Sequence, residues 1–105
     1  MGIAPAPAIK KLMAKSGLSL EQFGLIELNE AFAAQVLACL IEVPMDRTRL
    51  NVNGGAIALG HPIGCTGARI VITLVHEMAK RNVQYGLATL CISGGLGLAL
   101  AIEHP

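Results

Sequence analysis

Charged side chains are scarce in this chain. Only 14% of its 105 residues are Asp, Glu, Lys or Arg, whereas 53% are hydrophobic, and an ordinary globular chain has about 25% charged residues. A domain of this length has a large surface for its volume and should be more polar. We therefore expect part of its apolar surface to be covered by another polypeptide, either a missing half-domain or a second subunit.

Basic clusters and cysteine pairs are also lacking. The formal net charge is only +1 and the Lys and Arg residues are scattered, so we expect no nucleic-acid partner. The three cysteines show no CxxC spacing, which argues against a disulfide framework or a zinc site and favours a reducing compartment. We expect a cytoplasmic location, with the mitochondrion or peroxisome as alternatives, and neither a metal nor a cofactor.

Long apolar helices are lacking as well. Residues 51–68 and 86–102 contain no charged residue, but glycines interrupt both stretches, so neither predicts a membrane-spanning helix of about 20 apolar residues. Buried strands explain them better. The first residues do not show the basic-then-apolar order of a signal peptide. We expect no membrane partner and no secretion.

The pattern of apolar residues predicts three helices and about four strands in one domain. The strands are expected at residues 25–28, 50–53, 87–92 and 98–102, and the last two form a hairpin across a glycine-rich turn. A helix ending at Gly17, a second starting after Asn29 and a third around residues 70–78 alternate with them. This order predicts an α/β fold with a mixed, mostly parallel sheet whose last strand is antiparallel.

The three helices carry apolar residues at helical spacing. The second helix combines a wide apolar face with many alanines, so we expect it to be buried. The residues that define the three apolar faces are Ile9, Leu12 and Met13; Phe32, Leu37, Leu40 and Ile41; and Ile70, Val71, Leu74, Val75 and Met78.

Three polar segments are expected beyond the carboxyl ends of the strands, where ligands of α/β sheets gather. Asn29 lies at a strand-to-helix junction, and its simplest interpretation is a helix cap. His61 lies between Gly60 and Pro62, which hold the imidazole on a loop, so a role in proton transfer and a purely structural role are about equally favoured. Cys91 ends a strand, where most cysteines are only small hydrophobic residues.

The other candidate groups carry weaker signals. Cys39 is flanked by apolar helical residues and is expected in the core, whereas Cys65 near a helix start has only a weak indication of a lowered pKa. The glycines around residues 60–67 lack the Lys of a phosphate loop, and Gly95 with Gly97 lacks the third glycine of a dinucleotide site. We therefore expect no nucleotide site.

Three motifs together resemble the C-terminal signatures of thiolases. They are NEAFAAQ at residues 29–35, NVNGGAIALGHPIG at residues 51–64 and CISGGLG at residues 91–97. Their order and spacing agree with the family over essentially the whole chain. The resemblance implies the C-terminal half of an acetyl-CoA acetyltransferase or 3-ketoacyl-CoA thiolase, an acyltransferase that joins two acyl-CoA molecules by Claisen condensation or cleaves a 3-ketoacyl-CoA with CoA.

The resemblance also implies site residues. His61 would activate the nucleophilic thiol and contribute to an oxyanion hole, and Asn29 would hold the water that completes this hole. Cys91 would act as acid and base at the α-carbon of the incoming acetyl group, and the backbone N–H of Ser93 would help to form a second oxyanion hole. Ala31 and Phe32 would line the channel for the pantetheine of CoA.

The chain departs from the family pattern in several places. No cysteine here matches the acylated cysteine of thiolases, which lies in their N-terminal half, so the isolated chain is expected to be inactive. Ser93 and Ala4 stand where glycines are usual, and Ser93 would be strained if its φ were positive. The first strand of this half would precede Met1, which leaves an open sheet edge.

These expectations define the partners and the rival functions. The partners would be CoA and acyl-CoA, the N-terminal half and further copies in a homo-oligomer. The main alternative is a non-catalytic truncated fragment that survives as an associating domain. A hydrolase using Cys91 with His61 is a weaker alternative, because no third residue that orients the histidine can be identified from the sequence.

Overall fold

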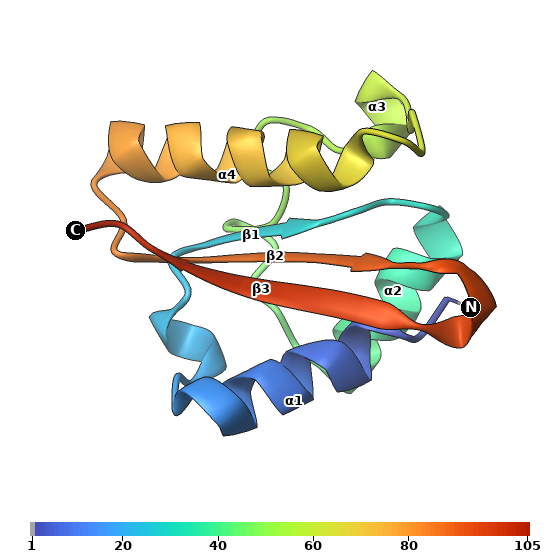
Figure 1. The fold of residues 1–105 in the computed structure, drawn as a ribbon, viewed down its shortest axis with the longest axis horizontal. Coiled ribbons are helices and arrows are strands. Elements are labelled where there is room, and N and C mark those ends of the chain that lie inside the picture. The colour runs from blue at the N-terminus through green and yellow to red at the C-terminus, as the bar shows by residue number, and fades with distance from the viewer. Residues whose placement is uncertain (1) are drawn as a thin grey trace.

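The computed structural model describes residues 2–105, so Met1 and its interpretation as a start lie outside the described residues. Figure 1 shows a three-layered arrangement in which the sheet lies between helices on both faces. The elements in chain order are α1 (Pro5–Ser16), a 3-10 turn η1 (Leu20–Gln22), β1 (Leu25–Leu28), α2 (Ala33–Glu42), α3 (Ala56–Leu59), α4 (Thr66–Arg81), β2 (Tyr85–Cys91), a 3-10 turn η2 (Ser93–Gly95) and β3 (Gly97–Glu103).

The sheet has the order β1-β2-β3. Strands β1 and β2 are parallel, with Leu28 opposite Thr89, and the backbone N–H of Asn29 continues the pairing by donating to the Thr89 carbonyl over 3.0 Å. Strands β2 and β3 form the predicted antiparallel hairpin, in which Cys91 lies opposite Gly97. The sheet is therefore mixed, as expected, and the carboxyl ends of β1 and β2 lie at the same edge.

Two apolar clusters hold the layers together. One packs α1 and α2 against one face of the sheet through Ile9, Cys39 and Leu87, all completely buried. The other packs the α4 residues Ile70, Leu74 and Met78 against the opposite face. The apolar spacing of the first and third predicted helices is thus confirmed, and so is the core position of Cys39.

Helix α1 ends as its sequence predicts. Gly17 has φ of 75° and follows the last residue of α1, where a left-handed conformation closes the helix. Asn82 takes the same role after α4 with φ of 54°.

The expected strand at residues 50–53 is wrong, because only Leu50 pairs, in an isolated parallel bridge with Ile26. Asn51 turns out of the extended conformation with φ of 47°. Its side-chain amide then replaces the next strand residue: Oδ1 accepts from the Leu28 N–H, and Nδ2 donates to the Leu28 carbonyl, both over 2.9 Å. The sheet accordingly has three strands instead of about four.

The prediction for the second helix is wrong in two respects. The helix begins at Ala33 after the extended residue Phe32, so Asn29 is not its cap. The helix is also not buried within this chain: Val36 and Cys39 face the core, but Leu37 is exposed and Ile41 is 83% exposed. The apolar face was assigned too broadly because alanines do not mark which side faces the sheet.

A fourth short helix, α3, was not expected. Its four residues lie inside the glycine-rich passage, after Gly55 and before Gly60, whose φ is 97°. The passage is therefore partly ordered by its own backbone hydrogen bonds, and it leads directly to His61.

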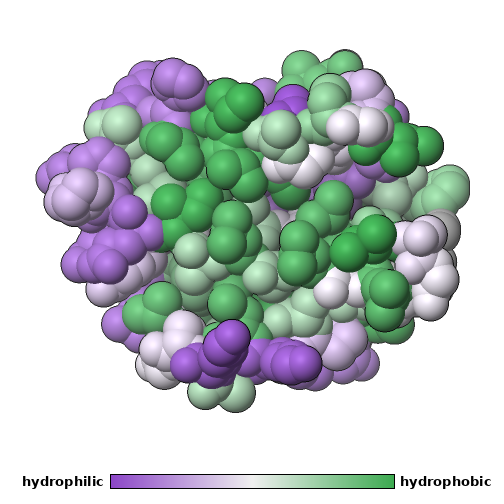
Figure 2. Space-filling model, in the orientation of Figure 1, coloured by the Kyte–Doolittle hydropathy of each residue, from purple (hydrophilic) through white to green (hydrophobic). Residues whose placement is uncertain are grey.

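The structure leaves much apolar surface uncovered. Figure 2 shows apolar side chains gathered over the middle of the face where β3 lies in front in Figure 1. β3 is an edge strand, and α4 lies over β1 and β2 rather than over β3. The exposed apolar residues of β3 and of the neighbouring side of α4 are Leu98, Leu100, Ile72 and Val75.

No helix in the described part of the chain is both long and apolar enough to cross a membrane.

Replacing Asn51 tests its role as a substitute for a strand residue. Asn51→Ala should lower the free energy of unfolding by about 2 to 4 kcal/mol, because it leaves the N–H and carbonyl of Leu28 without partners. Asn82→Ala is the matched control: Asn82 has the same left-handed backbone, and its loss should cost only about 1 kcal/mol. Equal costs in urea unfolding would contradict the assignment.

Candidate active site

Asn29 follows directly after β1, and its side chain is almost completely buried. Its Nδ2 lies 3.5 Å from His61 Nε2. Its Oδ1 is buried and has no hydrogen-bond partner among residues 2–105. A buried amide oxygen without a partner is costly unless another group pairs with it. Asn29 therefore presents an acceptor beside the imidazole.

His61 lies on the loop between α3 and α4 and is exposed. Its two ring nitrogens have different environments. Nε2 faces Asn29, whereas Nδ1 lies 2.7 Å from Oγ1 of Thr66, the first residue of α4. Thr66 is buried, so the imidazole is supported from the inside of the molecule and open on the outside. Two of the three polar segments thus lie together in the structure.

Cys91 is the last residue of β2 and is half-buried. It lies at the same sheet edge as Asn29, but no hydrogen bond joins it to Asn29 or to His61 in the part of the chain described. Strand alternation places its side chain on the face of Leu87 and Thr89, which α1 and α2 cover. The structure therefore brings Asn29 and His61 together and leaves Cys91 at the same sheet edge without a hydrogen bond to either.

The turn after β2 accommodates Ser93 without strain. Ser93 does not have a positive φ, whereas Gly94 and Gly95 have φ of 69° and 79°. The left-handed residues of the turn are thus both glycines, and the concern that a serine would distort it is removed. Ser93 is the first residue of η2, and the first N–H groups of a helical turn have no partner within it.

Ala31 and Phe32 lie between β1 and α2. Ala31 is half-buried, and Phe32 is 60% exposed. Neither contacts His61 through a hydrogen bond, as expected for apolar side chains, and an exposed aromatic ring at this sheet edge is available to another molecule.

Nearly the whole chain matches a family model. Residues 1–104 match the model described as "Thiolase, C-terminal domain". The chain belongs to the thiolase family.

Curated relatives support this membership over the full chain. An acetyl-CoA acetyltransferase of Chromobacterium violaceum is 54% identical over 105 residues, which are all of this chain and 27% of that protein. A 3-ketoacyl-CoA thiolase of Bacillus subtilis is 52% identical over 98% of this chain and 26% of its own length. The chain thus spans about a quarter of the relatives that it matches.

Solved structures agree with the fold. The crystal structure of the Bacillus anthracis acetyl-CoA acetyltransferase superposes with a TM-score of 0.95 at 56% identity, over 97% of this chain and 26% of that one. Human mitochondrial 3-ketoacyl-CoA thiolase superposes with a TM-score of 0.96 at 49% identity, over 99% of this chain and 26% of that one.

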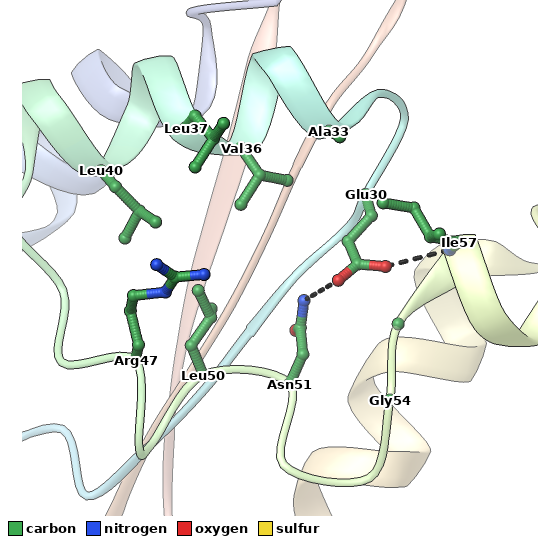
Figure 3. A pocket seen from close by; sticks show the side chains of 11 residues that line it. Glu30, Ala33, Val36, Leu37, Leu40, Arg47, Leu50, Asn51, Gly54 and Ile57 are labelled. Carbon is green, nitrogen blue, oxygen red and sulfur yellow. Dashed lines mark hydrogen bonds between the residues drawn. The ribbon is translucent and has the colours of Figure 1, made fainter.

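In this thiolase domain, Glu30 fastens the loop that carries His61 to the end of β1. Figure 3 shows its carboxylate between Asn51 and Ile57: Oε1 accepts from Asn51 Nδ2 over 3.3 Å, and Oε2 accepts from the Ile57 N–H over 2.9 Å. A Cβ at Gly55 would collide with this carboxylate and displace it. Glu30, Asn51 and Ile57 also line a pocket of about 410 Å³, and neither Asn29 nor His61 lines it.

A buried ion pair lies beneath the site. Glu27 on β1 is almost completely buried, and its Oε2 is 3.5 Å from Arg69 Nη1 on α4. Burial raises the pKa of Glu27 to about 7, and the positive charge of Arg69 opposes this rise, while the charge of Glu30 adds to it. The pair joins β1 to the first turns of α4, and it thereby fixes Thr66 relative to Asn29.

The thiolase motifs led to Asn29, His61, Cys91 and Ser93, but sequence reasoning missed Thr66, Glu27 and Arg69. A signal existed for Thr66, which follows His61 by five residues at the start of an amphipathic helix. The pairing of Glu27 with Arg69 had no sequence signal, because 42 residues separate them.

The raised pKa of Glu27 gives a testable pH dependence. Its carboxyl binds a proton more tightly in the folded chain than in the unfolded chain, whose value is near 4.5, so the free energy of unfolding should fall as pH rises from about 4.5 to about 7. Glu27→Gln should remove this dependence, and Arg69→Met should raise the pKa further. An NMR titration of the Glu27 carboxyl carbon measures it directly.

Glu77 is the control for this titration. Its pKa is lowered by hydrogen bonds from Asn53 and Arg81, so it should titrate well below Glu27. A Glu27 midpoint near 4.5 would contradict the assignment.

Proposed function

We propose that this chain is the C-terminal catalytic half of a thiolase, which acts on acyl-CoA thioesters only together with an N-terminal half. The observation that carries the proposal is the exposed His61 held against the buried amide of Asn29 at the carboxyl end of β1. A neutral imidazole that is open to solvent on one side can take the proton of a thiol supplied by another polypeptide.

His61 then has two roles. Nε2 takes the proton of the nucleophilic cysteine, whose thiolate attacks the thioester carbonyl and releases CoA. The protonated Nε2 can donate to the developing oxyanion. The partnerless Oδ1 of Asn29 supports the role expected for this residue, because it can accept a hydrogen bond from a water that completes the oxyanion hole.

Cys91 has a separate role at the second substrate. Its thiolate would remove a proton from the methyl carbon of an acetyl-CoA, and the enolate so formed would attack the acyl-cysteine and release it as a 3-ketoacyl-CoA. Cys91 and His61 act on different atoms in this scheme, so they need no direct contact. The N–H of Ser93, at the start of η2, is suited to stabilise the enolate oxygen.

The segment between β1 and α2, at the same sheet edge as the candidate site, would receive the substrate. We assign Ala31 and Phe32 to the wall of the pantetheine channel, which is supported by the exposure of Phe32. No further cofactor is needed for this chemistry, because CoA thioesters supply the leaving group.

The N-terminal half is the expected partner for the apolar surface of β3 and α4. β3 has a free edge onto which a further strand could pair. Leu98, Leu100, Ile72 and Val75 form an apolar surface beside this edge. The domain would thus be completed by a further strand and by the N-terminal half, and the completed enzyme is expected to form a homo-oligomer in a reducing compartment.

A non-catalytic associating domain is the second candidate. The lack of a matching nucleophile favours it, because the same apolar surface would then serve association alone. The two candidates differ in whether His61 matters once the partner is bound.

Thiolysis in the completed enzyme tests the proposal. The chain combined with the N-terminal half of a relative should cleave acetoacetyl-CoA in the presence of CoA, and neither part alone should do so. His61→Gln and Cys91→Ser should each lower kcat by at least about 100-fold, in line with the loss of an acid/base group.

Two matched variants complete this experiment. His104→Gln, in the C-terminal tail, is the control for His61→Gln, and Cys65→Ser, at the exposed cysteine, is the control for Cys91→Ser. Both control variants should keep near-normal activity. An assembled complex without turnover would overturn the catalytic proposal and favour the associating domain.

Charge on the β3 surface tests the interface. Leu100→Glu should prevent assembly with the N-terminal half, because it would bury an unpaired carboxylate. Ile41→Glu is the control: Ile41 is more exposed than Leu100 but lies on α2, on the other side of the sheet. Sedimentation of both mixtures measures assembly, and equal effects of the two variants would place the interface elsewhere.

A further inference from the structure

We infer that Thr66 is a positioning residue that holds neutral His61 in the tautomer protonated on Nδ1, so that Nε2 carries the basic lone pair. The inference rests on the proposed function only for its catalytic consequence. Thr66 is buried at the first residue of α4, and its Oγ1 is 2.7 Å from His61 Nδ1. This contact is at the short end of the range for a hydrogen bond involving nitrogen.

The hydroxyl of Thr66 has a single proton, and a second contact shows where it goes. Oγ1 donates to the carbonyl of Pro62 over 3.0 Å. With its proton used there, Oγ1 can only accept from the imidazole, so Nδ1 must carry the ring proton. Thr66 thereby links the backbone carbonyl of Pro62 to the imidazole ring of His61.

The other end of the ring agrees with this direction. Asn29 Nδ2 faces His61 Nε2 at 3.5 Å, and an amide N–H₂ group can donate only to a nitrogen that lacks a proton. The three contacts thus form one directed chain, from Asn29 to His61 to Thr66 to Pro62. Neutral imidazole in water prefers the proton on the other nitrogen, Nε2, so the site must impose this tautomer.

The consequence for catalysis is a base of defined orientation. An imidazole protonated on Nε2 would have to rotate before it could take the proton of a thiol on its exposed side. Thr66 removes this step and stabilises the imidazolium after proton transfer, because Nδ1–H keeps its acceptor in both charge states.

Thr66→Val and Thr66→Ser form a matched pair of variants. Valine keeps the shape but removes the hydroxyl, whereas serine keeps the hydroxyl. The fold should survive valine, because the Pro62 carbonyl still accepts the N–H groups of Cys65 and residue 66, over 2.9 and 3.0 Å. Circular dichroism of each variant checks this.

The direct readout is the tautomer of His61 in the full chain, assembled with the N-terminal half. Long-range ¹⁵N–¹H NMR correlations of ¹⁵N-histidine-labelled chain distinguish the two neutral forms. His76→Gln and His104→Gln variants assign the signals. Wild type and Thr66→Ser should show mainly the Nδ1–H form, and Thr66→Val should shift toward Nε2–H. A wild-type Nε2–H form, or a tautomer unchanged in Thr66→Val, would overturn the inference.

Kinetics separate this inference from the proposed function. Thr66→Val should lower kcat for thiolysis roughly tenfold, as expected for the loss of one hydrogen bond to the reacting group, and should leave KM nearly unchanged. The pH dependence of kcat should also shift in Thr66→Val. Thr66→Ser should restore both the value of kcat and its pH dependence. Full activity with valine would refute the positioning role while leaving the thiolase assignment intact. A complex without activity would refute the proposed catalytic function, and the NMR result would still decide the tautomer.

Discussion

The parallel pairing of β1 with β2 is the constraint on which the candidate site depends. Because both strands run in the same direction, their carboxyl ends meet at one edge, and the bond from Asn29 to Thr89 extends the pairing up to the site itself. Asn29 is thus fixed by the backbone, not by a helix cap. The loop with His61 then has to be brought to this edge from outside the sheet.

Polar contacts from three parts of the chain bring the loop there. The Asn51 amide occupies the place of a strand residue beside Leu28, Glu30 holds the start of α3, and the Glu27–Arg69 pair ties α4 to β1. Breaking the contacts of Asn51 or Glu27 is costly because it leaves partly buried groups unpaired. A loop rich in glycine can in this way present a histidine in one orientation.

Sequence reasoning predicted the elements whose signals are local. The apolar spacing of α1 and α4, the Gly17 cap and the hairpin predicted over residues 87–102 were all confirmed, and the three motifs identified the family. It failed where a side chain replaces backbone or where the contact is distant. Asn51 ends a strand that its apolar neighbours favour, alanine-rich α2 does not mark its core face, and the pairing of Glu27 with Arg69 exists only in three dimensions.

Acyl transfer to the N-terminal half tests the central claim that this chain supplies the base for a nucleophile on another polypeptide. The measurement is intact mass spectrometry of that half after exposure to acetyl-CoA, with and without this chain. The account predicts one acetyl group on the N-terminal half only when the chain is present, and its loss with a His61→Gln chain. Equal acetylation without the chain, or none in a stable complex, would contradict it.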